Sequence, residues 1–415
     1  MKCNEIIRAY GTDFSSITVR LLEAADLIGE IRKTVSKDLA RDDYTIAIKP
    51  NLVSPTPAVF GGTTHPEIVA GIIEYLNAGG IGSEHIVIME GSWVGDRTPE
   101  AFDYCGYLTL SEKYGVSLKD MQQERRITRT KCGDLDIDIC SAALEADYLI
   151  NVPVLKGHCQ TKVTCALKNM KGIIPNSEKR RFHRLGLHKP IACLNVGIRP
   201  DFIVIDHICG DPDFEEGGNP LVRNCVMAAK DPVLTDAYTC RVLGYSPDEV
   251  EYIGIAEELG VGKADLSKLV IKTAVGIPSD GEPEDRSGLT EEEMNSTAAD
   301  GLSAADGLSA ADGLPAARKL VDIACAVDEI DSCSACYGVL LPVLDRLKNE
   351  GSLDTLLEKL EGSRIGIGQG HRGKSGLLGT GNCTSGFKYC IKGCPPDEDR
   401  IYQELKSFIE KPDRL

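Results

Sequence analysis

Four cysteines near the C-terminal end of this chain have the spacing of metal ligands. Cys333 and Cys336 form a Cys-x-x-Cys pair, and Cys383 and Cys394 follow them after a long gap. Thiolates are soft ligands that suit an iron–sulfur cluster or zinc, and such a site needs about four residues that converge on one point. A Gly before Cys394 and two prolines after it indicate a turn that presents the sulfur with free backbone amides. The spacing therefore predicts an iron–sulfur cluster on these four cysteines.

Two other kinds of site remain open for the same residues. A zinc site is the first, although a zinc ribbon usually closes with a second Cys-x-x-Cys pair, which this tail lacks. A redox-active dithiol is the second. Cys390 lies between the last two expected ligands, and it either replaces one of them or packs beside the cluster. The cysteines of the preceding body are interpreted as small buried residues.

Polar side chains follow the ends of apolar runs in the body of the chain. Lys49 and Asn51 follow the run 44–48, and Lys156 and His158 follow the run 148–154. Ligands of open parallel sheets bind at the carboxyl ends of strands, so we predict one site at this edge. Its candidate catalytic residues are His158 and Lys156. Its candidate substrate-binding residues are Lys49, Asn51, Lys168, Asn169 and Lys171.

The segment 168–189 is basic, with Glu178 as its only acidic residue, although the whole chain has a formal net charge of -17. An isolated basic region focuses anionic substrates into a cleft. For 179–184 a solvated helix face is the alternative interpretation. The acidic balance argues against nucleic-acid binding, which needs a basic surface, and leaves small anionic molecules and proteins as partners.

Strand-like and helix-like segments alternate through the body, which predicts an α/β fold with a largely parallel sheet and flanking helices. The expected strands are 44–48, 85–89, 148–154, 202–206 and 268–272. Between them, 65–80 has a Pro near its start, apolar residues at helical spacing and a Gly pair at its end, so it is an expected crossover helix.

Composition divides the chain into three parts. We predict an α/β body at 1–278, a flexible acidic linker at 279–316 and a small C-terminal α/β iron–sulfur unit at 317–415. The linker contains a six-residue repeat, AADGLS, at 298–315, which is too short for a solenoid unit. The 16 cysteines, the lack of a signal peptide at the N-terminus and the lack of a bilayer-spanning apolar run predict a cytoplasmic protein without a membrane segment.

The order of several motifs resembles the iron–sulfur members of the domain of unknown function 362 family. In the body, over roughly 44–262, these motifs are IKPNLV, TTHPEIV, NVPVLKGH, TKVTCALKNMKG and AAKDPVLTDAYTCRVLGY. In the tail they are CSACYGVLLPVLDRL, GIGQGHRGKSG and GCPP, and the last is similar to a cluster-binding turn in the small cluster-bearing subunit of respiratory complex I. The resemblance implies a single 4Fe–4S cluster. The repeat and Cys390 have no place in the family pattern.

The resemblance also implies redox chemistry, because some iron–sulfur members look like reductases of unsaturated or aromatic small molecules. We therefore predict an iron–sulfur oxidoreductase that reduces an anionic unsaturated or aromatic molecule with electrons from a low-potential ferredoxin-like or flavin donor. Lys49, Lys156 and Lys168 would hold the substrate, and His158 would donate a proton because its charge changes near neutral pH. A hydrogen-bonded structural role is the other interpretation of His158. The alternative function is a non-catalytic iron–sulfur electron carrier or assembly partner, and the oligomeric state stays open.

Nucleotide binding has one signal in the sequence. Gly368 and Gly373-Lys374-Ser375 match the phosphate-loop pattern GxxxxGK[ST], so a phosphate loop is the alternative interpretation of this stretch. We interpret the glycine-rich stretch 366–381 as backbone that wraps the cluster beside Cys383.

Overall fold

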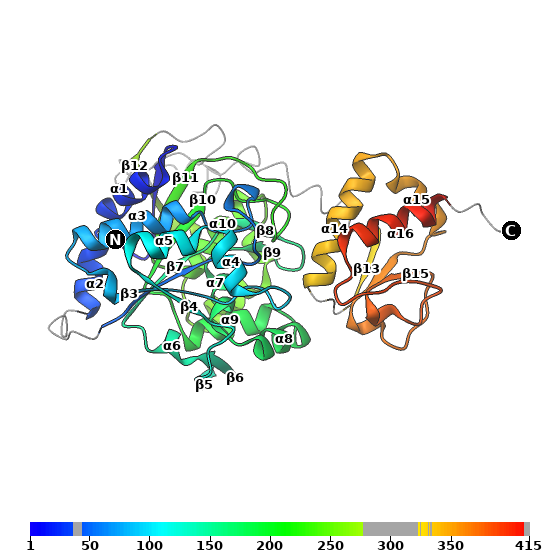
Figure 1. The fold of residues 1–415 in the computed structure, drawn as a ribbon, viewed down its shortest axis with the longest axis horizontal. Helices are drawn as coiled ribbons and strands as arrows, with labels where there is room; N and C mark the ends of the chain where they lie inside the picture. The colour runs from blue at the N-terminus through cyan, green and yellow to red at the C-terminus, as the bar shows by residue number, and fades with distance from the viewer. Residues whose placement is uncertain (36–43, 277–322, 324, 331, 333, 411–415) are drawn as a thin grey trace. The chain divides into compact units, whose positions relative to one another are not determined.

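The computed structural model describes residues 1–35, 44–276, 323, 325–330, 332 and 334–410 (Figure 1). Its contacts divide the chain into two compact units, Met1–Pro315 and Ala316–Leu415. The predicted linker at 279–316 lies outside the described residues, so the three-part division of the chain stays a prediction.

The first unit is built on an eight-stranded sheet with the strand order β12-β1-β11-β10-β7-β2-β3-β4. The strands are β1 (Glu5–Tyr10), β2 (Ile46–Pro50), β3 (Ile86–Glu90), β4 (Ser117–Asp120), β7 (Tyr148–Val152), β10 (Phe202–His207), β11 (Cys225–Ala229) and β12 (Val270–Val275). Strand β11 runs antiparallel to both neighbours, and the other pairs are parallel. The sheet is therefore mostly parallel, as the sequence predicted.

Helices cover both faces of this sheet. One face packs against α1 (Phe14–Ala25), α2 (Leu27–Val35), α3 (Pro66–Ala78), α4 (Thr98–Tyr104) and α5 (Tyr107–Tyr114), whose apolar residues join alternate strand residues in one buried cluster. The remaining helices are α6 (Ser141–Leu144), α7 (Ala166–Asn169), α8 (Asn176–Leu185), α9 (His188–Gly197), α10 (Pro232–Val242) and α11 (Glu251–Glu258). In Figure 1, α8 and α9 lie beside the hairpin of β5 (Ile127–Cys132) and β6 (Leu135–Cys140).

Local sequence explains where the predicted elements begin and end. Helix α3 begins with Pro66 directly after the N-cap residue His65, because proline has no N–H to leave unpaired in a first helical turn. The expected strands correspond to β2, β3, β7, β10 and β12 with small shifts at their ends. Strands β1, β4 and β11 were not among the expected strands. Because β11 is the antiparallel strand, a prediction without it could not show that the sheet is mixed.

The second unit contains a four-stranded parallel sheet with the order β13-β14-β15-β16. The strands are β13 (Val327–Glu329), β14 (Ile365–Ile367), β15 (Leu378–Thr380) and β16 (Tyr389–Ile391), and the helices are α14 (Ser334–Asn349), α15 (Leu353–Lys359) and α16 (Glu398–Glu410). Leu340, Leu344, Leu356 and Leu405 are fully buried, so the unit has an apolar core of its own.

No helix in the described part of either unit is both long and apolar enough to span a bilayer.

Candidate functional site

A buried ion pair joins the carboxyl ends of β2 and β3. The Nζ atom of Lys49 lies 2.9 Å from Oε2 of Glu90, and the two side chains are 0% and 3% exposed. Glu90 also accepts hydrogen bonds from the backbone N–H groups of Leu52 and Gly91 at 3.1 and 2.7 Å. Gly172 packs so closely against the pair that a β-carbon there would collide with Oε1 of Glu90. A side chain at position 172 would therefore displace the ion pair.

Three asparagines extend this network along the strand ends. Nδ2 of Asn51 donates to Oδ1 of Asn169 at 2.8 Å, and Nδ2 of Asn169 donates to Oδ1 of Asn151 at 2.7 Å. Lys49 donates to Oδ1 of Asn169 at 3.3 Å and to the carbonyl of Pro50 at 2.9 Å. Together with Glu90, these acceptors use all three donors of the Lys49 ammonium group. The predicted residues Lys49, Asn51 and Asn169 therefore lie together, but they bond mainly to one another.

Lys156 connects three segments beside this network. It begins β8 (Lys156–His158), which forms a short hairpin with β9 (Lys162–Thr164). Its buried ammonium group donates to Oδ1 of Asn51 at 2.9 Å and to the backbone carbonyls of Gly62 and Glu215 at 2.5 and 2.6 Å. Burial lowers the pKa of Lys156 to about 7; the charge of Glu215 opposes this shift and that of Lys168 adds to it. The ammonium group is thus poised to titrate near neutral pH.

A carboxylate from the segment 208–224, between β10 and β11, reaches the predicted site. Oε2 of Glu215 lies 2.9 Å from Nε2 of His158, and Oε1 accepts a hydrogen bond from Nζ of Lys168. Two backbone N–H groups donate to Nδ1 of His158 at 3.0 Å, so the neutral ring carries its proton on Nε2, which faces Glu215. The side chain of Glu215 is 18% exposed, whereas those of His158 and Lys168 are 0% and 3% exposed.

The charges around Glu215 shift one another's pKa values. Burial opposes ionisation of Glu215, but His158 and Lys168 hold its pKa well below the ordinary value. Burial lowers the pKa of His158 to about 4, against the pull of Glu215. Burial and the charge of Lys168 lower the pKa of Lys171, in the short helix η3 (Met170–Ile173), to about 7. Among the described residues, the ammonium group of Lys171 has no ion-pair or hydrogen-bond partner that would hold it in place.

A second polar cluster, whose members are not among the predicted site residues, lies at the same edge of the sheet. Nδ1 of His65 lies 2.9 Å from Oδ2 of Asp206, and Nε2 of His65 lies 3.7 Å from Sγ of Cys209. All three residues are buried. Burial would lower the pKa of His65, but the Asp206 carboxylate outweighs it and raises the pKa to about 10. The TTHPEIV motif was the available signal, because its histidine stands where a strand–helix connection reaches this edge.

Two aspartates that follow β11 have structural roles. Asp231 is the N-cap of α10 and accepts hydrogen bonds from the N–H groups of Val233 and Leu234 at 2.8 and 3.0 Å. Asp236 accepts a hydrogen bond from the N–H of Ala166 at 2.7 Å, at the start of α7, and burial raises its pKa to about 7. Asp236 thereby orients the helix that carries Lys168.

Some cations of the basic segment 168–189 are bound by other groups of the first unit. Lys179 is buried and donates to the carbonyls of Gly91 and Ser92 at 2.7 and 2.8 Å. Arg181 pairs with Glu178, and Lys189 pairs with Asp134 at 2.5 Å. Helix α8 also carries two exposed cations, Arg180 and Arg184. The cations of this segment that lie near Glu215 are Lys168 and Lys171.

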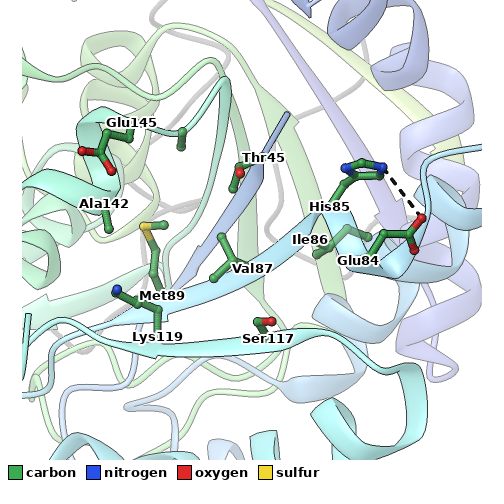
Figure 2. A pocket seen from close by; sticks show the side chains of 11 residues that line it. Thr45, Glu84, His85, Ile86, Val87, Met89, Ser117, Lys119, Ala142 and Glu145 are labelled. Carbon is green, nitrogen blue, oxygen red and sulfur yellow. Dashed lines mark ion pairs between the residues drawn. The ribbon is translucent and has the colours of Figure 1, made fainter. Parts of the chain in front are cut away.

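A hollow of about 300 Å³ lies elsewhere on the first unit, along β3 and β4 (Figure 2). It is lined by residues that include Glu84, His85, Met89, Lys119 and Glu145. In Figure 2, the Glu84–His85 ion pair stands at one end of the hollow and Lys119 and Glu145 stand at the other. The lining contains none of the predicted site residues, so the hollow is separate from the polar cluster.

The structure brings together segments that carry the predicted cluster ligands in the second unit. A β-carbon added at Gly381 would lie 3.5 Å from Sγ of Cys336. Gly381 leads directly into η7 (Asn382–Thr384), which contains Cys383, and the N–H of Asn382 donates to the carbonyl of Gly393 at 2.9 Å, next to Cys394. The segments of Cys336, Cys383 and Cys394 therefore meet around residue 381.

The described residues contain no group of three or more His, Cys, Asp or Glu side chains that could hold a metal ion. Cys333, the remaining predicted ligand, lies outside the described residues. Sγ of Cys390 lies 3.6 Å from both the carbonyl oxygen of Gly381 and Oγ1 of Thr384. The donor set of soft thiolates and its convergent segments fit an iron–sulfur cluster, but the cluster itself stays a prediction.

The glycine-rich stretch does not have the architecture of a phosphate loop. Gly373-Lys374-Ser375 is followed by strand β15, whereas a phosphate loop leads into the N-terminus of a helix.

Comparison with known proteins agrees with the motif order. Residues 46–241 match the family model described as Domain of unknown function (DUF362). The match supports this family for the body of the chain. The thylakoid-associated protein sll1697 of Synechocystis sp. is 22% identical over 253 residues, which cover 58% of this chain and 77% of that protein.

A solved structure, the lactate racemase apoprotein from Thermoanaerobacterium thermosaccharolyticum, gives a TM-score of 0.33 at 15% sequence identity. The match covers 64% of this chain and spans little more than half of the racemase, 57%.

Proposed function

We propose that this DUF362 chain is an iron–sulfur oxidoreductase that binds a small anionic molecule at the carboxyl ends of β2, β3 and β7 and reduces it. The observation that carries the proposal is the convergence of Lys156, Lys168, Lys171 and His158 at one edge of the sheet. Two of these lysines have pKa values near 7, because burial disfavours their charged forms. A bound anion would stabilise the charged forms of these lysines.

The lysines divide into two groups by their contacts. Lys49 and Lys156 use their donors on protein oxygens, so they hold strands and loops in place. Within the described part of the chain, the ammonium group of Lys168 bonds to one side chain, the carboxylate of Glu215, and that of Lys171 has no such bond. We assign contact with the substrate to Lys168 and Lys171 and assign support of the site to Lys49, Asn51 and Asn169.

Proton transfer suits Lys156 better than His158. Reduction of a carbon–carbon double bond consumes two electrons and two protons, and the best proton donor has a pKa near the working pH. The pKa of Lys156 is about 7, whereas the imidazole of His158, with a pKa of about 4, is neutral at pH 7. We propose that Lys156 releases the backbone carbonyl of Glu215 and donates a proton to the substrate, and that the Nε2–H group of His158 donates a hydrogen bond to the substrate anion.

The C-terminal unit would supply the electrons. Cys333, Cys336, Cys383 and Cys394 would hold one 4Fe–4S cluster, which carries electrons singly from a low-potential ferredoxin-like or flavin donor. The convergence of three of the four cysteine-bearing segments around residue 381 supports this assignment.

The test follows oxidation of the chemically reduced, anaerobically purified protein in the presence of unsaturated and aromatic carboxylic acids. For an acid that is consumed, Lys168→Met and Lys171→Met should slow oxidation about ten- to a hundred-fold, because each removes a charge-assisted contact. Lys189→Met is the matched control, since it removes a lysine that pairs on the surface with Asp134. Equal rates in all variants with a consumed acid would contradict the site, and the absence of any consumed acid would favour the electron carrier.

A further inference from the structure

The segment 208–224 places a carboxylate inside the proposed anion site. Oε1 and Oε2 of Glu215 contact Lys168 and His158 separately, so the carboxylate bridges two groups that are themselves buried. The backbone carbonyl of the same residue accepts a hydrogen bond from Lys156. Glu215 thus contacts three of the four side chains of the proposed site.

The neighbouring contacts hold the segment as a folded flap on the site. Asp211 is buried and accepts hydrogen bonds from the N–H groups of Asp213, Phe214 and Asn219 at 2.8, 2.9 and 2.8 Å. The segment also pairs with the connection before α3, where the N–H of residue 218 donates to the carbonyl of residue 60 at 2.8 Å. The carboxylate of Asp211 thus ties together the backbone of the segment, and Glu215 supplies a charged contact with the sheet edge.

The chemistry of this contact identifies what the site recognises. Lys168 and His158 are spaced to receive the two oxygens of a planar carboxylate, and Lys171 stands beside them with no partner of its own among the described residues. Removal of the Glu215 carboxylate would leave the buried Lys168 and the partly buried Lys171 as neighbouring cations. Their repulsion favours any anion that can take its place.

We propose that Glu215 is an internal occupant of the substrate site, which a carboxylate of a small-molecule substrate displaces. This inference rests on the proposed function and narrows its substrate class to carboxylic acids. The incoming carboxylate takes over the contacts with Lys168 and His158 and gains Lys171. The segment 208–224 then moves away from the sheet edge, so an empty site stays closed by its own flap.

The experiment measures binding of benzoate and crotonate, an aromatic and an unsaturated carboxylate, by titration calorimetry. Glu215→Gln keeps the shape of the side chain and removes its charge, so the affinity for both probes should rise about ten- to a hundred-fold. Benzamide, a neutral analogue of benzoate, should show no such gain. Glu112→Gln is the matched control, because it makes the same change of charge at an exposed residue on α5.

Lys168→Met separates failure of this inference from failure of the proposed function. If wild type binds benzoate, and Lys168→Met weakens the binding, but Glu215→Gln does not strengthen it, the anion site stands and the internal occupant is wrong. If neither wild type nor Glu215→Gln binds either carboxylate, both ideas are wrong. Tighter binding of inorganic phosphate than of both carboxylates by Glu215→Gln would overturn the carboxylate assignment.

Hydrogen exchange gives a second readout that a merely structural role of Glu215 would not produce. Saturating benzoate should speed amide exchange in 208–224 of the wild-type protein, because the flap loses its charged contact. Slower exchange in this segment with benzoate bound would show that the flap closes over the ligand, which contradicts displacement.

Discussion

The Nζ atom of Lys49 lies 2.9 Å from Oε2 of Glu90, and no more than 3% of either side chain is exposed. This ion pair fixes the ends of two adjacent strands, because Glu90 also bonds the backbone that follows each of them. In a buried pair of this kind, each charged group stabilises the other one in the interior. Loss of one member leaves an uncompensated charge in the interior.

Lys49→Met should therefore destabilise the first unit by about 3 to 5 kcal/mol. The double variant Lys49→Met/Glu90→Gln should recover part of this loss, since it removes the stranded charge. Urea denaturation at pH 7 measures both free energies of unfolding. Lys33→Met is the control, because Lys33 is 69% exposed and its pair with Glu30 contributes about 1 kcal/mol or less. Equal stability of the Lys49→Met and Lys33→Met variants would contradict a structural role for the pair.

The sequence predicted this edge of the sheet because strand ends are local features. The runs before Lys49 and Lys156 are apolar and β-branched, and polar residues at the carboxyl ends of parallel strands converge. The α/β fold, the mostly parallel sheet and the helix α3 were predictable for the same reason. The antiparallel strand β11 was not, since its direction depends on pairing with β1 and β10.

The partners of the site residues were not predictable from local patterns. Glu215 lies in an irregular segment and contacts His158 and Lys168, which are 57 and 47 positions away in the sequence. A periodic pattern of residues does not predict contacts over such distances. Likewise, the sequence could not show that all N–H donors of Lys49 are used on protein acceptors, whereas those of Lys171 are not, among the residues that the structure describes. That distinction depends on distant acceptors that only the folded chain brings together.

The His65–Asp206 pair predicts a pH dependence of stability. The pKa of His65 is raised to about 10, so its contribution is fully present below the unfolded pKa near 6.5 and is lost as pH rises toward 10. The stability advantage of wild type over His65→Gln should therefore shrink by up to about 1.4 kcal/mol per pH unit between pH 7 and 8. Comparing the two proteins removes the opposing contribution of Lys156 and Lys171, whose lowered pKa values make stability rise with pH in this range.

Denaturation with urea at pH 6, 7 and 8 measures this difference. A constant difference between wild type and His65→Gln across the series would mean that His65 is not held protonated by Asp206. Asn77→Asp, at an exposed position of α3, serves as a control for a general change of charge in the same helix.

The cluster assignment predicts about four iron and four acid-labile sulfide per chain in anaerobic preparations. Ser substitution of Cys333, Cys336, Cys383 or Cys394 should abolish the iron and the brown colour. Cys390→Ser should keep most of both, because the four predicted ligands complete the cluster without it. Stoichiometric zinc without sulfide would rule out the cluster. If the Cys390→Ser protein is colourless and the Cys383→Ser protein is brown, Cys390 is the ligand and Cys383 is not.

Carboxylate binding should weaken as pH rises above 7, and Lys171 is the residue that causes it. Its pKa of about 7 means that the free site loses this positive charge above neutral pH, because burial and Lys168 disfavour the ammonium form. A bound anion stabilises that form, so benzoate binding takes up a proton above pH 7 and its affinity falls by up to tenfold per pH unit. Calorimetric titrations from pH 6 to 8.5 measure the slope. Lys171→Arg should flatten it, since a guanidinium group stays charged throughout this range, whereas Lys189→Arg should leave it unchanged. If Lys171→Arg retains the full slope, the proton belongs to Lys156 instead, and Lys171 lies outside the binding site.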